Sequence, residues 1–154
     1  MMTASEYKIF RELIRTLEKK FGVLEDNEFS CCGITLAQCH ALVEIGRAGE
    51  ISLNELAQLN NLENSTMSRT VNNLVNSGLA ERNLDTRDRR FVTIALTAEG
   101  HSLFESIEVE MDKYFKEIFS HIPKDKEAQV LESLTLVVDA INKSSCCDQN
   151  NCCK

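Results

Sequence analysis

Residues 52–96 constrain the fold more than any other part of the sequence, because two short helical patterns are followed there by two β-rich runs. Ser52 and Glu55 have the spacing of a capping box, which predicts that a short helix begins there and covers residues 53–59. A polar turn follows, and a second helix is predicted over residues 65–77. Two short helices joined by a tight turn form the helix-turn-helix pattern.

Two runs rich in apolar and β-branched residues come next, at 79–84 and 91–96. Asp85 to Arg90, between these runs, are all polar or charged. This pattern predicts a β-hairpin with a charged tip. Gly78 stands just before the hairpin, where we expect it to end the second helix in the left-handed backbone conformation.

Amphipathic helices are predicted on both sides of this region. Thr3 and Glu6 have capping-box spacing ahead of a first helix. Thr35 and Gln38 repeat this spacing ahead of a second helix, predicted over residues 35–47. After the hairpin, Thr97 is expected to cap a long helix, and Pro123 suits the first turn of a last one. The apolar positions of the long helix step by three and four, as in a helix-pairing seam. We expect the first helix and the last two to form a dimer interface.

The charge is distributed unevenly along the chain. The net charge of −7 excludes a protein that coats nucleic acid along its whole surface. Residues 51–96 are neutral, since Arg69, Arg82, Arg87, Arg89 and Arg90 balance Glu55, Glu63, Glu81, Asp85 and Asp88. The apolar runs are too short for a membrane span, and charged residues interrupt any signal-peptide core, so we expect a cytoplasmic protein.

The stretches LNELAQLNNLENSTMSRTVNNLVNSGLAER, residues 53–82, and LDTRDRRFVTIALTAEG, residues 84–100, resemble the multiple antibiotic resistance regulator (MarR) family. The second matches that family's Asp-Arg-Arg wing and the Leu-Thr-x-x-Gly helix start after it. The resemblance implies a winged helix-turn-helix that is mainly α with a small β-hairpin wing. It also implies a homodimer that binds duplex DNA at a palindromic operator. No phosphate loop, nucleophile elbow or His/carboxylate pattern indicates an enzyme.

This resemblance divides the chain into parts. Residues 1–142 would form one MarR-like unit, in which residues 35–96 are the DNA-binding lobe. Residues 1–34 and 97–142 would supply the dimerisation helices. Residues 143–154 show no apolar periodicity and are expected to be a flexible Cys-rich tail.

The second helix of the helix-turn-helix is the first candidate DNA contact. It has no acidic side chain, and its short polar groups and single arginine suit a major groove. The candidates are Asn64, Ser65, Thr66, Ser68, Arg69, Asn72 and Asn73. The alternative is an ordinary solvated helix face.

The hairpin tip is the second candidate. Arg87 and Arg89 are expected to reach a minor groove, where narrow A·T tracts concentrate negative potential. Arg90 is a further candidate DNA contact. Asp88 is expected to orient an arginine and not to contact DNA, and the family resemblance implies that Arg90 braces the wing through such a pair. The alternative is a self-neutralised surface turn.

Seven cysteines in a chain without secretory features need their own explanation, and an odd number cannot all pair within one molecule. Cys31, Cys32 and Cys39 cluster early in the chain. Three thiolates suit a trivalent metalloid such as arsenite or antimonite, with Zn²⁺, Cd²⁺ or Cu(I) as further candidates. Cys39 shares a face with apolar residues, so a place in the core is an equal alternative for it.

Four more thiols, Cys146, Cys147, Cys152 and Cys153, lie near the C-terminus. They are candidates to complete a site, to deliver the metal or to form a separate site, and the alternative is a dispensable tail. The fold itself is expected to need no cofactor.

Three functions remain open on the sequence. The first is a repressor released from DNA by a thiol-bound metal or metalloid. The second is a repressor of the same type that responds to thiol oxidation. The third is a metal-sequestering or metal-delivery protein, for which the tail is the only support.

Overall fold

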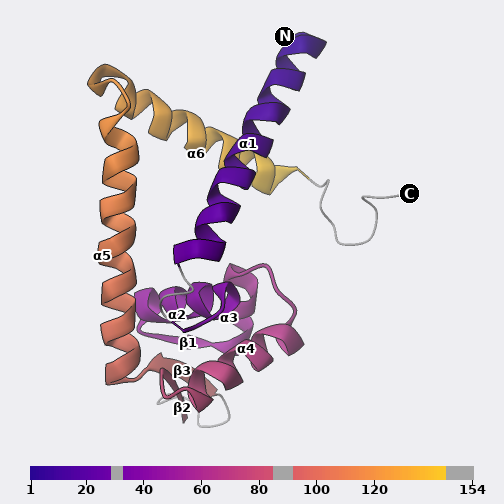
Figure 1. Cartoon of the computed structure of the whole chain (residues 1–154). Coiled ribbons are helices and arrows are strands. Elements are labelled where there is room, and N and C mark those ends of the chain that lie inside the picture. The colour runs from indigo at the N-terminus through magenta and orange to yellow at the C-terminus, as the bar shows by residue number, and fades with distance from the viewer. Residues whose placement is uncertain (29–32, 85–91, 145–154) are drawn as a thin grey trace. The chain divides into compact units, whose positions relative to one another are not determined.

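The computed structural model describes residues 1–28, 33–84 and 92–144. In these ranges the chain forms α1 (Ala4–Glu28), α2 (Leu36–Ala48), β1 (Glu50–Ser52), α3 (Leu53–Leu59), α4 (Asn64–Asn76), β2 (Ala80–Leu84), β3 (Val92–Leu96), α5 (Ala98–Ser120), the 3-10 helix η2 (Lys124–Lys126) and α6 (Glu127–Lys143) (Figure 1). This confirms the predicted class, mainly α with a small β-hairpin. None of the helices in the described ranges is long and apolar enough to cross a bilayer.

The chain separates into two compact units, Met1–Ile107 and Glu108–Lys154. The first contains α1 to β3 and the beginning of α5. The second contains the rest of α5, η2 and α6.

A three-stranded antiparallel sheet in the first unit has the order β1-β3-β2. The predicted hairpin supplies β2 and β3, with Arg82 opposite Ile94. β1 pairs with the other edge of β3, Ile51 lying opposite Ile94. This third strand was missed because its three residues are too few to show an alternating pattern.

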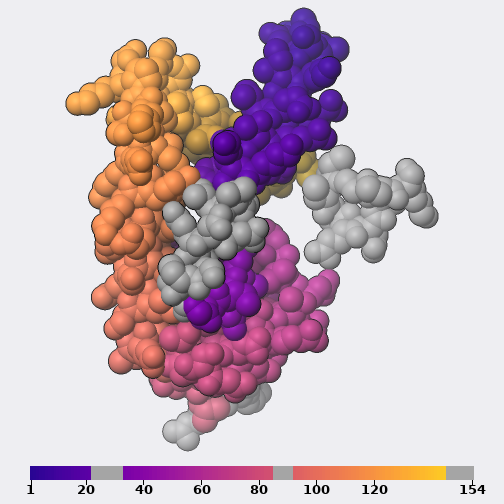
Figure 2. Space-filling view, in the orientation of Figure 1, coloured from indigo at the N-terminus to yellow at the C-terminus, as the bar shows by residue number. Residues whose placement is uncertain are grey.

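The core of the first unit lies among α2, α3, α4 and the sheet, which pack against one another. Its largest fully buried side chains are Leu42, Ile45, Leu56, Met67, Leu74, Ile94, Val71 and Cys39. The space-filling view shows the outer surface of these elements on one face of the molecule (Figure 2). Each fully buried leucine or isoleucine contributes about 1.5–3 kcal/mol through removal of its surface from water. We name this part of the first unit, residues 33–84 and 92–96, the winged lobe.

The predicted helix caps are present. Thr35 with Gln38, and Ser52 with Glu55, form reciprocal capping boxes at the starts of α2 and α3. The hydrogen bonds from Ser52 lower the pKa of the exposed Glu55 carboxyl below its ordinary value. Gly78 has φ +72°, the left-handed conformation predicted after α4.

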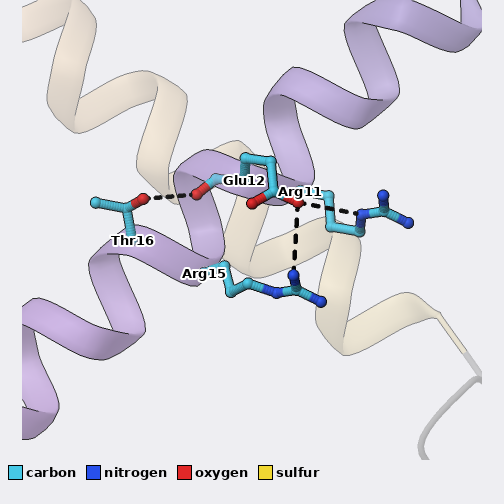
Figure 3. Close-up of polar contacts among 4 residues, drawn as sticks. All are labelled: Arg11, Glu12, Arg15 and Thr16. Carbon is cyan, nitrogen blue, oxygen red and sulfur yellow. Dashed lines mark hydrogen bonds and ion pairs between the residues drawn. The ribbon is translucent and has the colours of Figure 1, made fainter.

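α1 continues beyond Phe21, where its apolar periodicity fades, and ends at Glu28. Gly22 alone does not end it, because one glycine costs a helix only about 1 kcal/mol relative to alanine. On its surface, the carboxylate of Glu12 pairs with Arg11 and Arg15 at 3.8 and 3.6 Å (Figure 3). Such exposed pairs contribute little to stability.

The apolar positions of α1 and α6 remain exposed in the single chain. In α1 these are Tyr7, Ile9, Phe10, Leu13, Leu17 and Phe21, and in α6 they are Leu131, Leu134, Leu136, Val138 and Ile141. The predicted amphipathic helices therefore form, but their apolar side chains are not covered by the chain's own core.

Candidate nucleic-acid interface

α4 is the second helix of the predicted helix-turn-helix and has two distinct faces. Met67, Val71 and Leu74 recur at spacings of three and four residues and are fully buried. They fix α4 against α2 and α3. The packing therefore decides which face of α4 is presented to solvent.

The opposite face carries the predicted DNA contacts. Asn64, Ser65, Thr66, Arg69, Asn72 and Asn73 are exposed, and Ser68 is half-buried. No acidic side chain lies within Asn64–Asn76. This face offers hydroxyl and amide groups and one guanidinium, which are the donors that base edges and phosphates accept. The individual DNA contacts stay predictions.

Two asparagines of this face are also hydrogen-bonded to neighbouring elements. Asn64 Nδ2 donates to Asn54 Oδ1 on α3 at 2.8 Å. Arg82 Nη2 on β2 donates to Asn72 Oδ1 at 2.6 Å. The exposed face of α4 is thus linked to α3 near its start and to β2 further along. Arg82 was not among the predicted site residues, because its ten-residue separation from Asn72 follows no helical or strand period.

The start of α5 is joined to the segment that follows α4. The Thr97 hydroxyl donates to the Gly78 carbonyl at 2.6 Å and accepts from the Gly100 amide at 3.1 Å. The Thr97 amide donates to the Leu79 carbonyl at 3.1 Å. A Cβ on Gly100 would overlap that same carbonyl oxygen. Glycine is therefore required for this close approach of α5.

The predicted wing contacts Arg87, Arg89 and Arg90, and the predicted brace Asp88, lie outside the described residues. The same holds for Cys31, Cys32 and the four tail cysteines, Cys146, Cys147, Cys152 and Cys153. Their assigned roles stay predictions.

Cys39 is the one predicted thiol ligand that falls in the described ranges. It lies in α2 with only 1% of its surface exposed, among the side chains of the core. A small core residue was one of the two alternatives for it. Residues 1–28, 33–84 and 92–144 contain no group of three or more His, Cys, Asp or Glu side chains arranged to hold a metal.

The winged helix is also the fold of several solved transcription regulators. Streptococcus pneumoniae FabT, solved in complex with DNA, superposes with a TM-score of 0.78 at 20% identity over 88% of this chain and 97% of its own. The reduced form of MarR from E. coli superposes with a TM-score of 0.68 at 25% identity over 89% and 97%. The chain is therefore a winged helix-turn-helix protein.

Sequence comparison gives the family. The MarR family model matches residues 33–90. Among curated relatives, the uncharacterized HTH-type transcriptional regulator YdgJ of Bacillus subtilis is 24% identical over 113 residues, 73% of this chain and 69% of the relative. The HTH-type transcriptional repressor MdtR of the same species is 27% identical over 100 residues, 65% of this chain and 57% of the relative.

Residues 33–90 therefore belong to the MarR family of winged helix-turn-helix transcription regulators, and the chain has the fold of the solved MarR. The resemblance stated from residues 53–82 and 84–100 is thereby confirmed. Because this family consists of regulators and not of enzymes, the prediction of a non-enzymatic protein is confirmed as well.

Proposed function

We propose that this MarR-type regulator is a cytoplasmic repressor that binds a palindromic operator as a homodimer and is released by a thiol-bound metal or metalloid. The observation that carries the DNA-binding part is the exposed face of α4, which lacks acidic groups and is fixed by packing on the opposite side. FabT and the Staphylococcus aureus protein MepR, which share the fold, have been solved in complex with DNA. The name of MdtR supports repression.

The chemistry of α4 suits a major groove. A groove about 12 Å wide admits one α-helix, and short polar side chains let the helix approach the base edges. Ser65 and Thr66 lie in the first turn, and Arg69 lies one turn further along. We assign base-edge contacts to this set. The wing arginines, Arg87 and Arg89, are assigned to the neighbouring minor groove.

The homodimer is proposed on two grounds. A single recognition helix contacts too few base pairs for useful specificity, whereas two helices one DNA turn apart match a palindrome. The exposed apolar side chains of α1 and of α6 supply surface that a second copy can cover. Burial of such surface is the main favourable term in most protein association.

The effector part rests on the cysteines. Cys31, Cys32 and Cys39 are assigned as a three-thiolate site for arsenite, with Cys146, Cys147, Cys152 and Cys153 as further ligands. Cys39 lies in α2, and α2 packs against α4. A ligand bound through the Cys39 thiol would therefore act on a helix in direct contact with the proposed recognition helix. Differential binding to the DNA-bound and released states would then weaken operator affinity.

The test is a DNA-binding titration of the reduced, full-length protein on its own upstream region, with and without arsenite, zinc and peroxide. We expect tight binding that arsenite relieves. Cys31→Ser and Cys32→Ser should abolish this relief and leave DNA affinity unchanged. Relief by peroxide alone would favour the oxidation sensor instead.

Two other outcomes would overturn parts of the proposal. Tight binding that is indifferent to all three agents would remove the thiol effector and leave the repressor. Absence of specific DNA binding, together with tight metal binding, would favour the metal-sequestering or metal-delivery function.

A further inference from the structure

A side-chain hydrogen bond joins α4 to the first strand of the hairpin. Arg82 Nη2 on β2 donates to Asn72 Oδ1 on α4 over 2.6 Å, and both side chains are exposed. β2 packs against α4, which places the guanidinium beside the helix. The face proposed for DNA contact thus includes a cation that α4 itself does not supply.

The alternation of the strand keeps this cation away from the nearest acidic residue in the sequence. Successive side chains of a strand point to opposite faces, so Arg82 and Glu81 lie on different faces of β2. Glu81 Oε1 instead accepts from Asn83 Nδ2 at 3.3 Å. Across the described part of the chain, no carboxylate pairs with Arg82.

The partner of Arg82 is neutral, which preserves its charge and most of its donors. A guanidinium has five N–H donors, and the bond to Asn72 uses one of them. An aspartate at position 72 would neutralise the cation, whereas the asparagine amide does not. Arg82 therefore retains a full positive charge for a phosphate.

The same bond also fixes the orientation of the Asn72 amide. Its Oδ1 is held by Arg82, so the two N–H donors on Nδ2 lie on the other side of the amide carbon. A bidentate contact to adenine needs both the oxygen and the nitrogen of one amide. With one lone pair of its oxygen occupied and that oxygen turned toward Arg82, Asn72 offers chiefly its donors, which suit guanine O6 and N7 or thymine O4.

We propose that Arg82 and Asn72 act as one unit that presents chiefly hydrogen-bond donors to DNA. Arg82 is a positioning residue that turns the Asn72 amide nitrogen toward an acceptor on a base edge, and its remaining N–H groups contact a phosphate. This inference rests on the proposed DNA-binding function, and it adds a specificity determinant that comes from β2.

The test begins with the wild-type full-length chain, reduced and without added metal, which selects duplexes from a random pool. Fluorescence anisotropy then gives Kd on the selected duplex, and on each single base-pair variant of it, over a range of salt concentrations. Arg82→Gln and Asn72→Asp are compared with Lys124→Gln, a matched loss of one exposed positive charge in η2.

We expect Arg82→Gln to weaken binding about tenfold and to reduce the slope of log K against log salt by about 1. It should also broaden the base preference at one position of each half-site. Asn72→Asp keeps an acceptor for Arg82 but loses the donors, so the preference at that same position should disappear. Lys124→Gln should leave affinity, salt slope and preference unchanged.

Arg82→Gln with wild-type affinity, salt slope and base preference would overturn the inference, and the DNA-binding function would stand because the wild type still selects a duplex. Loss of affinity without any change in base preference would also overturn it, since Arg82 would then be a phosphate contact only. If the wild type selects no duplex, the proposed function fails together with the inference. Circular dichroism of each variant checks that the fold is retained.

Discussion

The winged lobe and the terminal helices α1 and α6 differ in the burial of their apolar side chains. In the lobe, Leu42, Leu56 and Leu74 are completely buried. In α6, by contrast, no residue is buried, and Leu136 keeps 63% of its surface exposed. The lobe therefore has a core of its own, whereas the terminal helices have apolar faces that lack one.

This difference matters because both regions show the same amphipathic pattern in the sequence. Isolated helices shorter than about 12–15 residues are only marginal in water, and in proteins most helical stability comes from packing of an amphipathic face. For the lobe helices the packing partner is within the same chain. For α1 and α6 we propose that the packing partner is a second copy of the chain. Substitutions in the lobe core and on the apolar face of α6 test this difference.

The largest effect is expected from the lobe core. Leu42→Ala removes a side chain with 0% exposure, and we expect it to lower the free energy of unfolding by about 2–5 kcal/mol. The matched control is Leu59→Ala on α3, where 57% of the side chain is exposed, and its effect should stay within about 0.5 kcal/mol. Urea unfolding followed by circular dichroism measures both. Equal losses of unfolding free energy in the two variants would contradict a core that is confined to the buried side chains.

The next effect concerns the close approach of α5 to the lobe. Gly100→Ala places a Cβ against the Leu79 carbonyl oxygen, a backbone atom that cannot move alone, and should cost about 3 kcal/mol. In Gly46→Ala the new Cβ meets Phe104 Cδ2 at 2.6 Å, and because a side chain can shift, we expect about 1 kcal/mol. Thermal unfolding compares the two variants. The reverse order would show that the α5 start adjusts more easily than the Phe104 ring.

The terminal helices provide the third test. Leu134→Glu places a charge on the exposed apolar face of α6, and we expect the dissociation constant of the dimer to rise at least tenfold, or ~1.4 kcal/mol. Glu132→Gln on the same helix is the control and should leave dimerisation unchanged. Sedimentation equilibrium measures both. A Leu134→Glu protein that dimerises like the wild type would remove α6 from the interface.

The smallest effect is expected from the loss of a helix cap, and at one of the two caps the loss of stability depends on pH. Ser52→Ala should cost about 1 kcal/mol of stability, as should Thr35→Ala. The two caps differ because Ser52 lowers the pKa of Glu55, whereas Thr35 is paired with the uncharged Gln38.

The sign of the pH effect follows from the lowered pKa of Glu55. Between the folded and unfolded pKa values the unfolded chain binds more protons, so this stabilisation is complete above the ordinary value of 4.5 and is lost as the pH falls through the folded pKa. Ser52→Ala should reduce this acid dependence, because the Ser52 amide still donates to the Glu55 carboxylate when the hydroxyl is gone, and Thr35→Ala should leave it unchanged. Carboxyl NMR titration of Glu55 measures the shift directly. An unchanged titration in Ser52→Ala would exclude the hydroxyl as its cause.

Much of the fold was predictable because its signals are local. The capping boxes at Thr35 and Ser52 and the left-handed Gly78 each depend on residues within one helical turn. The exposed polar face of α4 was predictable for the same reason, since the periodicity that buries Met67 and Val71 leaves the other positions exposed. Where the local signal was weak, as after Phe21, the sequence did not predict where the first helix ends.

The rest depended on contacts between distant segments. The three residues of β1 form a strand only because β3 offers an edge for pairing, and no pattern within these residues indicates a strand. Likewise, Arg82 reaches Asn72 only once β2 packs on α4. For Cys39 the sequence left two alternatives, and the position of α2 in the core decided that the thiol is buried.

The sequence by itself determined the order of the main helices and of the hairpin, the helix caps and the polar face of α4, because these follow from residue spacing and backbone preference. Tertiary structure alone decided which apolar faces find a partner within the chain, how close α5 comes to Leu79, and which side chains join α4 to its neighbours. The physical reason is that burial and side-chain pairing depend on distances in space, which spacing along the chain does not specify.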